Sequence, residues 1–85
     1  MYPTDCICSV QGNRLYIALN KRTKASDPFI SEITAYDLDT FERTGQAIRK
    51  NTTCRFIGPA TGTDYLSVFT LTYAVIYDKI TLKGL

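Results

Sequence analysis

Short apolar runs with a spacing of two residues, separated by segments rich in glycine, asparagine and aspartate, constrain this chain more than any other feature. Leu15, Ile17 and Leu19 recur at every second position directly after the pair Gly12 and Asn13. Such alternation is typical of a β-strand, and glycine and asparagine tolerate the backbone conformation of a tight hairpin turn. The sequence therefore predicts an all-β fold, and no segment favours a helix of more than one turn.

We expect an antiparallel meander of about seven short strands. Six apolar runs account for these seven strands. The run 65–77 supplies two of them, because it is too long for one strand and should break at Leu71 and Thr72. The predicted strands are residues 6–10, 14–19, 29–38, 46–48 and 54–57, with two more within 65–77. Between them we expect an exposed loop at 20–28, a reversal at 39–45, a polar connection at 49–53 and a turn at 60–64. Residues 79–85 either extend the last strand or begin another.

The length and composition predict one small domain over residues 1–85. Hydrophobic residues make up 45% of the chain and charged residues 21%, a balance that excludes a disordered chain. A domain of 85 residues has only a thin core.

The chain also contains a weak internal repeat, with one copy at 6–45 and the other at 54–84. Each copy ends in Tyr-Asp with a threonine three residues after the aspartate, at Tyr36-Asp37 and at Tyr77-Asp78. A meander alternates strands and turns in any case, so the repeated pattern can also arise by coincidence.

The stretch NRLYIALN…ITAYDLDTFERTGQAI resembles a blade of the YVTN or WD40-like β-propellers, although the Gly-His and Trp-Asp marks of WD40 blades are absent. The resemblance implies two propeller-blade-like sheets. Two blades cannot close a ring of the usual four to eight. Several copies would then complete the ring, or the two sheets would close on each other as a small sandwich or barrel.

Three cysteines, Cys6, Cys8 and Cys54, are the only residues that suggest a metal site. A structural zinc ion needs four ligands, and the chain has no histidine. We therefore expect the cysteines to pack in the core and expect no metal or cofactor. Their odd number argues against a disulfide-stabilised secreted domain.

The location that the sequence predicts is the cytoplasm. Residues 1–4 lack the basic and apolar segments of a secretion signal, and the uncharged run 65–77 is shorter than a membrane helix. We expect a protein that does not contact membranes.

Catalytic groups are scarce. There is no histidine, and no serine lies in a nucleophile motif, so we expect the protein not to be an enzyme. The alternative is a small hydrolase that uses the paired carboxylates of Asp37 and Asp39.

Basic residues gather in two segments that a meander brings to one end. Successive connections alternate between the ends of a sheet, so Lys21, Arg22 and Lys24 should lie near Arg49 and Lys50. Acidic residues should collect at the opposite end, namely Asp39, Glu42 and Asp64. The basic end suits another protein or an anionic macromolecule, nucleic acid included, although lysine and arginine also simply keep loops soluble.

Four aromatic residues recur at even spacing, which predicts one aromatic face that serves as an interface between copies. They are Tyr65, Phe69, Tyr73 and Tyr77. A core this thin cannot hold all six tyrosines of the chain, so some should be exposed.

These observations favour a non-catalytic protein-interaction module. We expect a self-associating regulator or inhibitor, for instance a viral or mobile-element accessory protein, that engages its partner through the basic loop end. The alternatives are a small nucleic-acid-binding β-barrel and the small hydrolase with Asp37 and Asp39.

Overall fold

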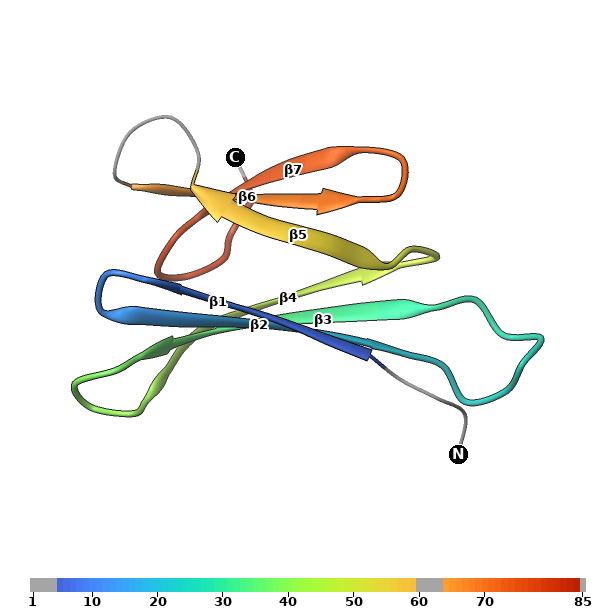
Figure 1. The fold of residues 1–85 in the computed structure, drawn as a ribbon, viewed down its shortest axis with the longest axis horizontal. Coiled ribbons are helices and arrows are strands. Elements are labelled where there is room, and N and C mark those ends of the chain that lie inside the picture. The colour runs from blue at the N-terminus through green and yellow to red at the C-terminus, as the bar shows by residue number, and fades with distance from the viewer. Residues whose placement is uncertain (1–4, 60–63, 85) are drawn as a thin grey trace.

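The computed structural model describes residues 5–59 and 64–84, which form seven antiparallel strands in two stacked sheets (Figure 1). The first sheet contains, in this order, β1 (Asp5–Gln11), β2 (Arg14–Lys21), β3 (Ile30–Asp37) and β4 (Arg43–Lys50). The second contains β5 (Cys54–Pro59), β6 (Tyr65–Thr70) and β7 (Ala74–Asp78). The predicted all-β meander is confirmed, and the described residues include no helix.

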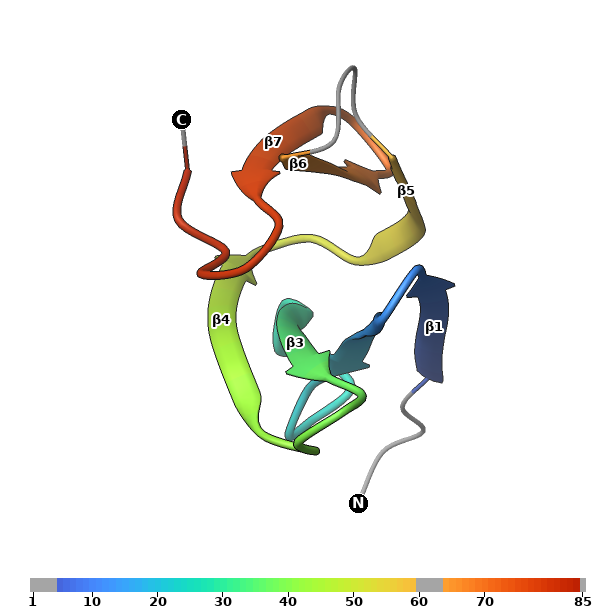
Figure 2. The same ribbon diagram turned by 90° about the vertical axis from the view of Figure 1, so that its left-hand side faces the viewer.

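The two sheets form a small sandwich and do not close into a barrel (Figure 2). The small barrel that the sequence also allowed is therefore wrong. Each sheet is a simple meander whose outermost strands pair on one side only, so both sheets keep open edges.

The strand boundaries differ from the prediction chiefly at β4. This strand includes Gly45, Arg49 and Lys50, which were expected in a reversal and in a polar connection. The full length of β3 offers a partner, and Ile30 pairs with Lys50 at its far end. Polar residues are common in such an edge strand, so the apolar residues of the sequence marked only part of β4 and the predicted strand was too short.

The break of the run 65–77 is confirmed, because a turn at Leu71 and Thr72 separates β6 from β7. After β7 the chain turns again, and Gly84 forms an isolated bridge with Tyr77. Residues 60–63 of the turn predicted at 60–64 lie outside the described residues.

The core lies between the sheets and comes from alternate positions of their strands. The first sheet contributes Ile33 and Ala35, and the second contributes Leu66 and Val68. In β2 the buried apolar residues are Tyr16 and Ala18, whereas Leu15, Ile17 and Leu19 point to the other side of the sheet and are partly exposed. Because residues 15–19 of this strand are all apolar, alternation alone could not identify its core face.

A buried asparagine joins the two sheets. The Asn20 side chain accepts a hydrogen bond from the backbone N–H of Cys54 (2.8 Å) and donates to its carbonyl (3.0 Å) and to Asp5 (2.7 Å). Asn20 is fully buried, so these bonds satisfy polar groups that would otherwise lose their water. They fix the start of β5 against β2.

The cysteines separate into two environments. Cys54 is buried, and burial raises the pKa of its thiol. Cys6 and Cys8 are exposed, with their sulfur atoms 3.8 Å apart. The expectation that all three pack in the core is wrong for this pair, because the even-numbered side chains of β1 point away from the second sheet.

No cluster of three or more possible metal ligands occurs within residues 5–59 and 64–84. In the same part of the chain, no helix is long and apolar enough to cross a membrane.

The two Tyr-Asp-x-x-Thr segments form the same turn. The Asp37 carboxylate accepts hydrogen bonds from the backbone amides two and three residues later, at 2.8 and 3.3 Å. The Asp78 carboxylate does the same at 2.9 and 3.0 Å. Both aspartates cap a tight reversal that follows the third strand of a sheet.

The backbone of these turns also agrees. The amide of Phe41 donates to the carbonyl of Asp37 (2.8 Å), and that of Leu82 donates to Asp78 (2.9 Å). Phe41 and Leu82 both have positive φ, at 60° and 55°. The pairing after the turn matches as well, since Gly84 lies opposite Tyr77 as Arg43 lies opposite Tyr36. The repeated sequence pattern therefore has a structural counterpart.

Candidate functional site

The strand register brings the basic segments together at one end of the first sheet. Lys21 and Lys50 both lie opposite Ile30, one on each neighbouring strand. Figure 1 shows the β2–β3 loop and the β4–β5 connection on the same side of the molecule. The binding role of these residues stays a prediction.

The predicted basic residues do not all share a face. Lys21 and Lys50 extend from the outer face of the first sheet, the face turned away from the second sheet. Arg49 extends to the other side, where its guanidinium lies 5.4 Å from the centre of the Tyr73 ring. Arg49 is thus engaged by the second sheet, and the outer basic surface consists of Lys21, Arg22, Lys24 and Lys50.

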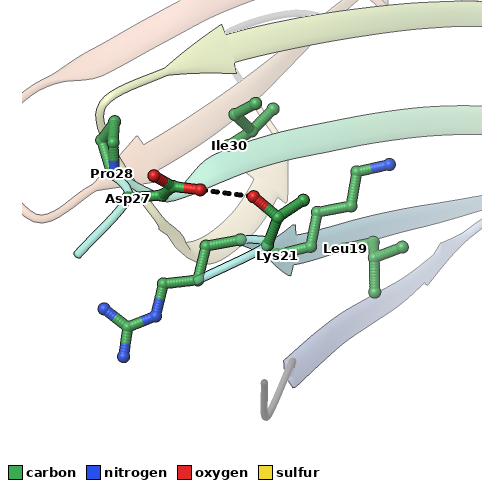
Figure 3. A pocket seen from close by; sticks show the side chains of 7 residues that line it. Leu19, Lys21, Asp27, Pro28 and Ile30 are labelled. Atoms are coloured by element: carbon green, nitrogen blue, oxygen red, sulfur yellow. Dashed lines mark hydrogen bonds between the residues drawn. The ribbon is translucent and has the colours of Figure 1, made fainter. Parts of the chain in front are cut away.

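A groove of about 690 Å³ opens at this end, between the β2–β3 loop and the outer face of the first sheet. Leu19 and Ile30, from β2 and β3, form its apolar floor, and Pro28 stands at its side (Figure 3). The side chains of Lys21 and Arg22 contribute to its rim. Sequence reasoning missed the groove because the loop had no predicted conformation.

The loop is held by its own contacts. The Thr23 hydroxyl donates to the Asp27 carboxylate (Figure 3), and the Arg22 guanidinium donates to the carbonyl of Ala25 (3.1 Å). The same guanidinium lies 4.4 Å from the centre of the Phe29 ring. Its Nε is buried and has no acceptor among the described residues, so one donor of Arg22 is unused.

Positive charge exceeds negative charge around the groove. Lys21 forms an ion pair with Glu32. Arg22, Lys24 and Lys50 have no ion-pair partner within residues 5–59 and 64–84. An apolar floor therefore lies beside cations that no carboxylate of the described residues neutralises.

The two carboxylates of the hydrolase alternative serve the β3–β4 turn. Asp37 caps the turn, and Asp39 accepts a hydrogen bond from the Asn13 side chain (2.6 Å). The acidic residues that the sequence placed at the opposite end lie there, at the β3–β4 turn and at the start of β6. This geometry accounts for both aspartates without a reaction.

The four aromatic residues predicted to share one face do not do so. Tyr65 and Phe69 lie on the outer face of the second sheet, and Tyr73 lies in the turn before β7. Tyr77 is wrong as an interface residue, because it pairs with Leu66 and is buried in the core with only 3% of its surface exposed. The turn at Leu71 and Thr72 interrupts the spacing on which the prediction depended.

Both outer sheet faces carry exposed apolar side chains, which sequence reasoning did not state. On the first sheet Val10 and Ile48 are exposed, and on the second Phe56 and Ile76 are exposed. The run Leu15 to Leu19 carries the signal, since a strand that is apolar at every position is typical of a sheet buried on both faces.

No family model, curated protein or solved structure matches this chain. A functional assignment therefore depends on the groove, the charges around it and the two outer faces.

Proposed function

We propose that this protein is a non-catalytic interaction module that binds an acidic segment of another protein in the groove at the basic end of the first sheet. The observation that carries the proposal is the aliphatic floor of Leu19 and Ile30 next to Arg22, a lining cation without a carboxylate partner among the described residues. By occupying such a segment, the module acts as a regulator or inhibitor of its partner.

The size and chemistry of the groove match a short peptide segment. Its volume lies within the range of about 300 to 1,000 Å³ that is usual for binding pockets. One apolar side chain covers Leu19 and Ile30, and carboxylates on either side of it reach Arg22, Lys24 and Lys50. Charge-assisted hydrogen bonds and complementary charge supply orientation and specificity.

A protein partner is favoured over nucleic acid by the residues that line the groove. Single-stranded nucleic acids bind by stacking bases on exposed aromatic rings. The described residues that line the groove include no aromatic residue, and the nearby Phe29 ring is occupied by Arg22. An aliphatic floor suits a side chain better than a base.

Fluorescence anisotropy tests this function. The probe is a short, capped, fluorescein-labelled peptide with one phenylalanine flanked by glutamates. We expect a dissociation constant of about 10 to 100 µM at low salt, weakening as salt screens the charges. Two control peptides have alanine in place of phenylalanine or glutamine in place of glutamate, and both should bind at least about tenfold more weakly.

Protein variants locate the site. The double variant Arg22→Glu and Lys24→Glu should reduce peptide affinity at least about tenfold. Arg43→Glu and Lys83→Glu make the same charge change at exposed positions away from the groove and should leave affinity unchanged. Binding of a single-stranded oligonucleotide without binding of the peptide would overturn the proposed partner class. Binding of neither would overturn the site.

We further propose that the two sheets are blade-like units of the β-propeller type. The matching aspartate-capped turns and the matching place of Gly84 and Arg43 support this proposal. We place the protein in the cytoplasm, because the exposed thiols of Cys6 and Cys8 persist in a reducing compartment.

A further inference from the structure

Two residues at equivalent places in the repeat differ greatly in exposure. Leu82 and Phe41 follow their capping aspartates at the same distance and share a positive φ, yet Leu82 is 3% exposed and Phe41 is 79% exposed. Leu82 belongs to the core cluster between the sheets, and its turn rests on β4 at Gly45. Figure 1 shows the turn after β7 reaching the first sheet, and the β3–β4 turn extending away from the first sheet in the same direction.

The same relation extends across the strands. Leu66 lies opposite Tyr77 in the second sheet, as Leu15 lies opposite Tyr36 in the first. Two residues later, Val68 corresponds to Ile17. Leu66, Val68 and Tyr77 are at most 3% exposed, because the first sheet covers them. At these three positions the outer face of the first sheet carries the same or a similar residue as the face that the second sheet buries.

The opposite surfaces correspond in the same way. On the outer face of the second sheet, Phe69 and Ile76 take the places that Ala18 and Ala35 hold on the buried face of the first. Phe56 lies opposite Phe69, with the ring centres 5.8 Å apart. This aromatic face is chemically suited to cover the aliphatic face of another first sheet.

We propose that copies of this chain associate head to tail, with the outer face of the second sheet of one copy packed on the outer face of the first sheet of the next. Phe41 is then buried at the contact as Leu82 is buried within the chain. The proposal goes beyond the groove, because it concerns the centre of the outer face of the first sheet and the outer face of the second, whereas the groove lies at one end of the first sheet. It commits to a second copy, since the chain itself carries both matching faces.

The second sheet has the smaller face and sets the size of the contact. Its three strands, about 4.8 Å apart and five or six residues long, present a face of about 290 Å². One contact then buries about 600 Å² in total, the size of a weak interface, and the two contacts that each copy makes in a ring bury about 1,200 Å². A head-to-tail contact closes into a ring if its rotation permits. A ring of about four to eight sheets contains about two to four copies.

The groove stays open in this assembly. Its floor residue Leu19 corresponds to Thr70, which remains partly exposed although the first sheet covers the centre of the second. Partner binding and self-association can therefore be measured separately.

A mixing experiment tests the proposal. Phe41→Glu blocks the face of the first sheet, and Phe56→Glu blocks that of the second, both at exposed positions where folding should tolerate the change. By size-exclusion chromatography with light scattering, we expect the unaltered chain to form about two to four copies and each variant alone to be monomeric. An equal mixture of the variants should form a dimer, because one unblocked contact remains.

Leu71→Glu is the matched control, because Leu71 is 72% exposed but lies in the turn outside both faces. It should assemble as the unaltered chain does. The proposal is overturned if the unaltered chain is monomeric, if either blocked variant still assembles, or if the mixture stays monomeric. Circular dichroism of each variant confirms folding, and Ile17→Glu and Ile76→Glu replace any variant that does not fold. Peptide binding by the Phe41→Glu monomer separates this outcome from that of the groove.

Discussion

Asp78 shows how one side chain holds the repeated turn. Its carboxylate accepts hydrogen bonds from the backbone amides of Thr81 and Ile80, and these bonds lower its pKa. A group whose pKa is lower in the folded chain than in the unfolded chain stabilises the fold above its unfolded pKa. That contribution is lost as the pH falls through the folded pKa.

We therefore predict that Asp78→Asn destabilises the protein at neutral pH. Asparagine can still accept a hydrogen bond, but it carries no charge for the amides to stabilise. The difference from the unaltered chain should shrink below about pH 4 and disappear in stronger acid. Urea unfolding midpoints measured from neutral to acid pH check this, with Asp64→Asn as the control. A difference that does not change with pH would contradict it.

At the scale of residues, the sequence located the repeated Tyr-Asp pairs but not the role of their aspartates. Asp37 and Asp78 cap their turns by accepting hydrogen bonds from nearby backbone amides, a role that an aspartate before a reversal takes whatever packs around it. Cys6 and Cys8 could not be placed, since alternation shows that two residues share a face but not which face is buried. The exposure of Tyr73 and the burial of Tyr77 also depended on a neighbouring sheet.

At the scale of elements, Gly45 allows the turn after β7 to pack directly on β4. A Cβ atom at this position would lie 2.4 Å from the backbone carbon of Thr81. Backbone atoms cannot move aside as a flexible side chain can, so the two sheets would have to separate locally.

Gly45→Val should therefore destabilise the fold by about 2 to 3 kcal/mol, as overpacking of a core does. Chemical denaturation measures the change. Gly84→Ala is the matched control, since a Cβ atom there meets nothing within 4 Å and should leave stability nearly unchanged. Equal stability of the Gly45→Val variant and the unaltered chain would show that the turn does not rest on β4 in solution.

Elements were predictable where apolar runs are bounded by turn residues. The hairpin at Gly12 and Asn13 and the break at Leu71 are such cases. The extent of β4 was missed, because an edge strand pairs through its backbone and its polar side chains give no periodic signal. The groove at Leu19 and Ile30 could not be predicted either, because it depends on the path of the β2–β3 loop, which has no periodic signal.

For the whole molecule, the two exposed cysteines report on assembly. Cys8 lies opposite Ile17, and its counterpart in the second sheet is Ile57, which is buried. Desolvation, together with the neighbouring thiol of Cys8, raises the pKa of Cys6. Burial raises the pKa of Cys54, so Cys54 should react slowest in every state.

We predict that iodoacetamide labels Cys8 at least about tenfold more slowly in the assembled protein than in the Phe56→Glu monomer. Mass spectrometry of labelled peptides over time gives the rate for each cysteine. Cys54 serves as the internal control, because the core covers it in both forms. Equal rates for Cys8 in the two proteins would place it outside the contact between copies.

The eight residues that join β2 to β3 have only the short turn between β6 and β7 as their counterpart in the second sheet. The second sheet thus shows that such a meander forms without a long connection between its second and third strands. The basic loop is an addition to a framework complete without it, so its composition is free to diverge while the strands stay under packing constraint. A change in the composition of this loop should therefore leave the architecture unchanged.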